Sequence, residues 1–191
     1  MIGLFFGSFN PVHIGHLIIA EYMATRHFEE VWLVVSPHNP HKNTGELLAE
    51  SNRFSLVKKC LRGNSKLKAK DFEFYLEKPS YTYLSLAYLR QKYPAQTFSI
   101  IMGSDNLEKL HTWKNFAQIV SQYNIFVYPR LGYATHNEHL ASFAENIQLT
   151  QAPILEISST QIRYQLKNGL SIKYLVLPNI EKEIVKNNFY L

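Results

Sequence analysis

Apolar residues along the chain form short continuous runs, and longer amphipathic stretches separate them. The runs predict strands at Ile2–Phe6, Val31–Val35, Phe98–Met102 and Asn124–Tyr128, with weaker ones at Leu67–Ala69 and Ile147–Leu149. Unbroken apolar runs of this length are typical of parallel strands that helices cover on both faces.

Helical periodicity fills the intervals between these runs. It predicts helices at Ile14–Arg26, Ser51–Leu61, Thr82–Lys92, Trp113–Val120, Ser159–Lys167 and Glu181–Lys186. Strands and helices that alternate favour a parallel sheet with right-handed crossovers. We therefore expect one α/β domain over residues 1–191. Its sheet is doubly wound, with mostly parallel strands and helices on both faces, and a C-terminal helical portion begins at about residue 159.

The composition is that of a globular protein, with 46% hydrophobic and 18% charged residues. No apolar run approaches the roughly 20 residues of a membrane span, and the single cysteine excludes an intramolecular disulfide. We expect a cytoplasmic protein with no membrane contact. The net charge of +5 raises the alternative of an RNA-binding module. Because the basic residues are scattered and no RNA-binding aromatic strand is visible, we expect no nucleic-acid partner. A homo-oligomer stays open.

The segment after the first predicted strand, Gly7–Leu17, carries two histidines where a helix begins. His13 and His16 are three residues apart, so both side chains can face one side. A helix N-terminus offers free amides and positive potential to a phosphate, and imidazoles donate hydrogen bonds without a permanent charge. Gly15 leaves the backbone open to close approach. The segment is interpreted as a phosphate-binding loop. The alternatives are two core or capping histidines, or a metal site, for which no third ligand stands at a convincing spacing.

A second anion-binding pattern lies near the C-terminus, at Glu156–Arg163. Ser158, Ser159 and Thr160 are residue types that cap helix N-termini. Arg163 follows about one turn later, and its side chain leans back towards the helix start. The pattern predicts an anion cradle with a cation, with an ordinary capped surface helix as the alternative.

Single chemical groups follow the other predicted strands. Asp105 can accept hydrogen bonds from ribose hydroxyls or cap a helix that begins near Leu107. Trp113 suits either the core or stacking on an aromatic ligand. Lys42 and Arg130 suit either a phosphate or a solvated loop.

The pattern Gly7-Ser8-Phe9-Asn10-Pro11-x-His13-x-Gly15-His16 resembles the signature of the nucleotidyltransferase superfamily, and most closely that of bacterial nicotinate-nucleotide adenylyltransferases. Further segments match in the family's order: Gly103-x-Asp105, Ser80–Thr82, Tyr128–Arg130 and Ile157–Arg163. The resemblance covers most of the chain. It implies a Rossmann-like fold and an adenylyltransferase of NAD biosynthesis that acts on ATP and nicotinate mononucleotide. Phe6, Ser8 and Asn10 depart from the commoner Gly, Thr and Asp, and Leu84-Ser85-Leu86 replaces Asp-Thr-Leu.

The resemblance also implies residue roles. The ATP-binding residues would be Gly7, Ser8, Phe9, His13, His16, Gly103, Asp105, Ile157, Ser158, Ser159, Thr160 and Arg163. The acceptor-binding residues would be Lys42, Arg53, Ser80, Tyr81, Thr82, Trp113 and Arg130.

No nucleophilic elbow is visible in the sequence, and none is required. A phosphate monoester has a second pKa near 6, so the acceptor itself can attack the α-phosphorus of ATP. We hypothesise that His13, His16, Lys42 and Arg163 offset the repulsion between the two anions while Mg²⁺ bridges phosphates of ATP. Mg²⁺ typically binds through phosphates and water, so no protein ligand to it is expected. Nicotinamide mononucleotide, phosphopantetheine and glycerol phosphate stay open as acceptors, and a non-catalytic nucleotide sensor is the rival from another class.

Overall fold

The protein, in a computed structural model that describes residues 1–38 and 47–191, is built on a six-stranded parallel sheet. Its strand order is β3-β2-β1-β4-β5-β6. The strands are β1 (Ile2–Gly7), β2 (Glu30–Val35), β3 (Leu67–Lys70), β4 (Phe98–Gly103), β5 (Ile125–Tyr128) and β6 (Ile147–Leu149). The expected doubly wound, Rossmann-like α/β fold is confirmed, and each predicted strand is present to within about one residue at each end.

Seven α-helices and three 3₁₀ helices are present over the described ranges. The α-helices are α1 (Ile14–Arg26), α2 (Glu50–Cys60), α3 (Thr82–Lys92), α4 (Ser104–Leu107), α5 (Phe116–Gln122), α6 (Ser159–Lys167) and α7 (Pro178–Lys186). The 3₁₀ helices are η1 (Phe72–Tyr75), η2 (Leu110–Thr112) and η3 (Glu138–Asn146). None of the helices in the described ranges has the length and apolar character that crossing a membrane requires.

Three predicted helix starts are wrong for local reasons. The helix expected from Trp113 begins at Phe116, because Asn115 adopts a left-handed conformation (φ 57°) that Asn tolerates and a helix does not. The last helix begins at Pro178, since proline suits the first helical position. Helix α4 begins at Ser104, so Asp105 lies inside its first turn and does not cap it.

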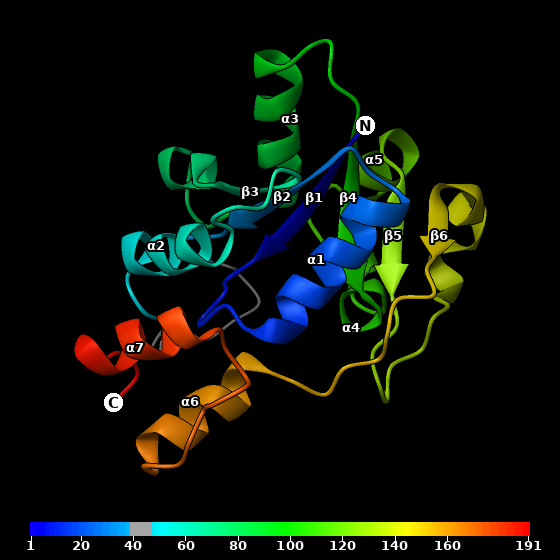
Figure 1. The fold of residues 1–191 in the computed structure, drawn as a ribbon. Helices are drawn as coiled ribbons and strands as arrows, with labels where there is room; N and C mark the ends of the chain where they lie inside the picture. The colour runs from blue at the N-terminus through cyan, green and yellow to red at the C-terminus, as the bar shows by residue number, and fades with distance from the viewer. Residues whose placement is uncertain (39–46) are drawn as a thin grey trace.

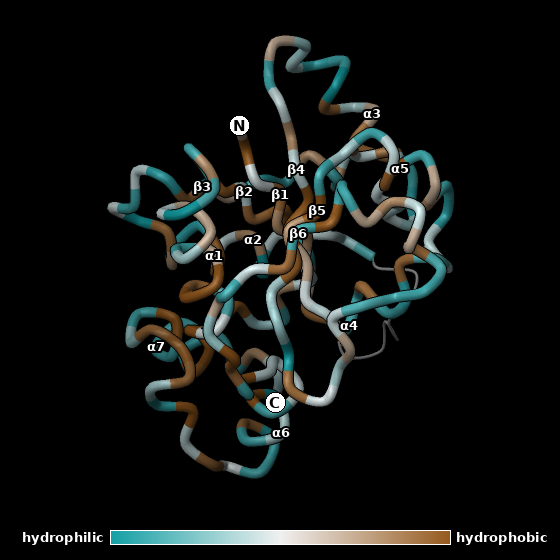
Figure 2. Tube along the Cα trace, turned by 90° about the vertical axis from the view of Figure 1, so that its right-hand side faces the viewer, coloured by the Kyte–Doolittle hydropathy of each residue, from teal (hydrophilic) through white to brown (hydrophobic). Residues whose placement is uncertain are grey.

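Two hydrophobic cores lie on opposite faces of the sheet. Successive residues of β1 alternate between the two cores. Phe5 belongs to the core that also contains residues of α1, α2, α6 and α7, whereas Leu4 belongs to the core that contains residues of α3, α4 and α5. Figure 1 shows α1 in front of the sheet with α6 and α7 beyond the ends of the strands. Figure 2 shows hydrophobic residues concentrated in the central strands and hydrophilic ones in the outer turns.

From β1 the chain adds β2 and β3 on one side of the sheet and then adds β4, β5 and β6 on the other, so the order reverses between β1 and β4. Helices α1 and α2 cover one face, and the connections that follow β4 and β5 cover the other. The crevice beyond the carboxyl ends of two such strands is where open α/β sheets bind ligands. The fold therefore directs the search for a site to the ends of β1 and β4.

Candidate active site

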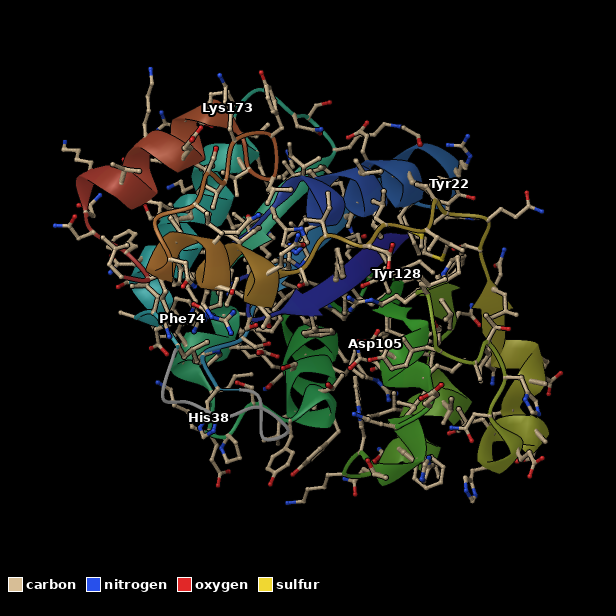
Figure 3. The ribbon with its side chains drawn as sticks, turned by 90° about the horizontal axis from the view of Figure 1, so that it is seen from below. Tyr22, His38, Phe74, Asp105, Tyr128 and Lys173 are labelled. Carbon is tan, nitrogen blue, oxygen red and sulfur yellow. The ribbon has the colours of Figure 1, made fainter. Side chains whose placement is uncertain are left out.

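A cleft of about 1050 Å³ opens at the carboxyl ends of β1 and β4. Figure 3 looks onto this edge, with Asp105 and Tyr128 on one side and His38 on the other. All but two of the sequence-predicted site residues line it: Gly7, Ser8, Phe9, His13, His16, Ser80, Tyr81, Thr82, Gly103, Asp105, Trp113, Arg130, Ile157, Ser158, Ser159, Thr160 and Arg163. Of the other two, Lys42 lies outside the described residues, and Arg53 lies elsewhere.

The two histidines of the first loop cap the N-terminus of α1 reciprocally, because the side chain of each accepts from the main chain of the other. Nδ1 of His13 accepts a hydrogen bond from the main-chain N–H of His16 at 3.4 Å, and Nδ1 of His16 accepts one from the N–H of His13 at 3.3 Å. Their rings stack with centroids 3.6 Å apart. Because both Nδ1 atoms are acceptors, the neutral tautomer of each ring carries its proton on Nε2. Capping and phosphate binding are therefore compatible here, because capping uses only the Nδ1 atom of each ring.

His13 is uncharged at neutral pH. Its side chain is 6% exposed. Burial and, to a smaller extent, the positive charge of Arg130 together lower the pKa of His13 to about 3. At neutral pH this imidazole can thus offer a phosphate a hydrogen bond but no positive charge. The hypothesis that His13 offsets the repulsion between the two anions is therefore restricted. His13 can donate a hydrogen bond from an uncharged ring, but it does not supply positive charge.

Two glycines of the first loop make room for side chains of that same loop. A Cβ on Gly15 would lie 3.1 Å from Nδ1 of His13. A Cβ on Gly7 would lie 2.9 Å from the ring of Phe9, a buried residue with φ 45°. Gly15 thus has a packing role, since it lets the His13 ring lie against the start of α1. The expectation that Gly15 also opens the backbone to a nucleotide stays a prediction.

The carbonyl oxygens of the first loop are bound by side chains from distant parts of the chain. Nη1 of Arg163 donates to the carbonyl of Asn10 at 3.0 Å, and Oγ of Ser159 donates to the carbonyl of Pro11 at 2.9 Å. Ser158 caps α6 by accepting from the N–H of Gln161. The predicted convergence of the first loop and the start of α6 is present in the structure.

The acceptor-binding prediction for Arg53 is not supported. Arg53 is fully buried, and its guanidinium donates to four main-chain carbonyls. These belong to Leu48, Ser8, Ser36 and Pro37, so the side chain joins the segments that follow β1 and β2. Burial lowers the pKa of Arg53. The sequence shows an arginine in an amphipathic helix and does not reveal which face of that helix is buried.

Asp105 and Arg130 form an ion pair in the cleft, with Oδ2 and Nη1 3.1 Å apart. Oδ1 of Asp105 is buried and has no hydrogen-bond partner among the described residues. A Cβ on Gly103 would overlap Oδ1 of Asp105 and lie 2.9 Å from Cδ of Arg130. Gly103 thus makes room for this pair. Burial raises the pKa of the neighbouring Tyr128, and the charge of Asp105 raises it further.

The opposite wall of the cleft contains Ser80–Thr82 and Trp113. Trp113 is half-buried and follows η2, outside any helix. Sequence reasoning missed two residues on this side. Lys114, next to Trp113, places Nζ 4.8 Å from the ring centroid of Tyr81. Glu73 is buried in the cleft wall.

Comparison with known proteins agrees with this geometry. The family model described as cytidylyltransferase-like matches residues 4–165. The protein named probable nicotinate-nucleotide adenylyltransferase from Cytophaga hutchinsonii is 47% identical over 190 residues, which cover 99% of this chain and 97% of that protein. The chain belongs to the nicotinate-nucleotide adenylyltransferases of the cytidylyltransferase-like family. The Flavobacterium johnsoniae protein with the same name is 45% identical over 190 residues, which cover 99% of this chain and 98% of that protein.

Members of this nucleotidyltransferase family keep the fold at low sequence identity. A solved Plasmodium falciparum nicotinic acid mononucleotide adenylyltransferase, complexed with NaAD, superposes with a TM-score of 0.83 at 22% identity. The match covers 99% of this chain and 96% of the other.

Replacing Arg53 by Met should destabilise the protein by about 3 kcal/mol or more, because four buried carbonyls lose their donor. Urea denaturation measures this change. Arg62→Met, which alters an exposed arginine just after the same helix, should stay within about 0.5 kcal/mol of the wild type. An Arg53→Met protein of wild-type stability with weakened acceptor binding would instead support the acceptor-binding role that the sequence predicted for Arg53.

The depressed pKa of His13 makes stability fall as the pH falls from about 6.5 towards 3. In this window the unfolded chain binds a proton at His13 and the folded chain does not, which costs about 1.4 kcal/mol per pH unit. His13→Asn, which keeps a capping residue type, should remove this part of the slope in urea titrations between pH 4.5 and 7.5. The exposed His136→Asn should retain it. Equal slopes in His13→Asn and the wild type would contradict a neutral His13.

Proposed function

We propose that the protein transfers the adenylyl group of ATP to nicotinate mononucleotide, giving nicotinate adenine dinucleotide and pyrophosphate. One observation carries this proposal most directly: the N-termini of α1 and α6 meet at one cleft, across which the Ser80–Thr82 segment and Trp113 form the other wall. Two helix N-termini suit a triphosphate, and an aromatic ring beside hydroxyls suits a pyridine nucleotide.

In this proposal the first loop and α6 hold the phosphates of ATP. His13 and His16 donate through Nε2–H, and the start of α6 contributes Ser159, Thr160 and the Arg163 cation. Oδ1 of Asp105, buried and still able to accept, suits a ribose hydroxyl. On the acceptor side we assign Ser80, Tyr81, Thr82 and Trp113 to the pyridine ring, and Arg130 and Lys42 to the phosphate.

The reaction needs no protein nucleophile. An oxygen of the acceptor phosphate forms a bond to the α-phosphorus of ATP, and the bond from that phosphorus to the β-phosphate oxygen breaks, so pyrophosphate leaves in line. The protein aligns the two anions and stabilises charge on the equatorial oxygens. Arg163 and Arg130 supply positive charge there, while His13 supplies a neutral hydrogen bond.

A divalent cation fits this site through the nucleotide. The protein groups at the phosphate end are N–H and O–H donors, which match phosphate oxygens and not a metal ion. Across residues 1–38 and 47–191, no three His, Cys, Asp or Glu side chains are placed to hold one. We therefore propose that Mg²⁺ is held by phosphates of ATP and water, where it neutralises phosphate charge.

Pyrophosphate release from ATP and Mg²⁺ tests the acceptor. Nicotinate mononucleotide, nicotinamide mononucleotide and phosphopantetheine are supplied in turn, and we expect nicotinate mononucleotide to give the highest kcat/KM. Faster release with either of the others would reassign the acceptor. Nucleotide binding without release with any acceptor would favour a sensor.

His16→Ala should lower turnover at least about tenfold, because it removes a hydrogen-bond donor to the reacting phosphates. Circular dichroism and the thermal midpoint show whether the fold is kept. His136→Ala, an exposed histidine outside the cleft, serves as the matched control and should keep wild-type turnover. Unchanged turnover in His16→Ala would reject the role of this side chain.

A further inference from the structure

An acidic residue lies buried in the acceptor wall of the cleft, where the proposed mechanism has no use for it. Glu73 belongs to η1, is 2% exposed and lines the cleft. Glutamates are almost never this deeply buried unless they are paired or hydrogen-bonded. No cation is bonded to it among the described residues. Its surroundings should therefore explain what keeps a carboxyl group there.

Serine hydroxyls surround the carboxyl group of Glu73. Oγ of Ser85, in the first turn of α3, donates to Oε1 at 2.5 Å. Burial raises the pKa of Glu73, and hydrogen bonding by the hydroxyls of Ser85, Ser36 and Ser80 opposes that rise. The three serines come from α3, from the end of β2 and from the segment before α3. The carboxyl group thus lies where three parts of the cleft wall meet.

Two polar atoms in this cluster are not fully bonded. Oε2 of Glu73 and Oγ of Ser80 are both buried, and neither makes a hydrogen bond of good geometry among the described residues. One is an acceptor and the other a rotatable donor, so they are chemically complementary. The observed bond between Glu73 and Ser85 therefore carries the connection between η1 and the start of α3.

The same segment makes a second contact, with a residue that is not among those proposed to bind ATP. The main-chain N–H of Ser80 donates to the carbonyl of His38 at 2.9 Å. The ATP side is instead held by Ser159, Arg163 and the two capping histidines. Substitutions at Glu73 should therefore perturb acceptor binding more than ATP binding.

We propose that Glu73 is a positioning residue for the acceptor: its carboxylate accepts the hydroxyl of Ser85 at the start of α3 and so sets the preceding segment, Ser80–Thr82, against the acceptor ring. This inference rests on the proposed function, in which that segment binds the acceptor. Glu73 acts through Ser85 and does not touch the reacting atoms.

The test compares how each substitution changes the KM for nicotinate mononucleotide and the KM for ATP. In Glu73→Gln, one carboxylate acceptor becomes an amide donor of the same size, and the KM for nicotinate mononucleotide should rise about five- to tenfold. The KM for ATP should stay within about twofold of the wild type. Ser85→Ala, which keeps the acid and removes one donor, should shift the same constant in the same direction. Glu77→Gln, the same change at an exposed position of the same connection, should leave both constants unchanged.

The possible results separate this inference from the proposed function. A wild-type protein that releases no pyrophosphate with nicotinate mononucleotide would reject the function itself. An active wild type whose Glu73→Gln variant raises both KM values equally, or neither, would overturn the positioning role alone. If Glu73→Gln does not fold, Ser85→Ala decides: an unchanged KM for the acceptor overturns the inference, and a selective rise supports it.

Discussion

The site depends on where the carbonyl oxygens of the first loop point. A loop that is to receive phosphate must keep its own acceptor oxygens away from the anion. Here Arg53 binds the carbonyl of Ser8, Arg163 binds that of Asn10, and Ser159 binds that of Pro11. With these acceptors bound by protein donors, hydrogen-bond donors remain for the ligand. In the proposed mechanism both arginines therefore support anion binding by fixing main-chain carbonyls, and Arg163 also lines the cleft.

The cleft combines neutral and charged donors. A site that holds two phosphate-bearing ligands must offset their repulsion and still release pyrophosphate. In the proposed mechanism the neutral His13 ring donates to a phosphate oxygen without adding fixed charge, whereas Arg130 and Arg163 supply the positive charge. Arg130 already has an anionic neighbour in Asp105, so a phosphate must compete with that carboxylate for the guanidinium. The burial that keeps His13 neutral and the ion pair that restrains Arg130 both moderate the charge of the cleft.

The sequence predicted the parts of this structure that rest on periodicity and on local capping chemistry. Unbroken apolar runs identified the parallel strands, and candidate residues that directly follow them in the chain line the cleft at their carboxyl ends. The sequence could not show that His13 and His16 cap each other, because reciprocal bonding depends on ring orientation. It also misplaced Arg53 and overlooked Glu73 for one reason. A charged residue is normally solvated, and only tertiary contacts reveal that carbonyls or hydroxyls have replaced its water. The start of α5 was missed because the left-handed Asn115 is a backbone property of a single residue.

The hydrogen bonds from α6 to the first loop also bear on how the site matures during synthesis. The histidine loop leaves the ribosome first, yet Ser159 and Arg163, which bind two of its carbonyls, are made only after nearly the whole sheet. A growing chain can thus assemble β1 to β6 before its nucleotide loop has the contacts that shape it. Nucleotide-binding competence should therefore arise late, as a property of the finished polypeptide and not of its N-terminal half.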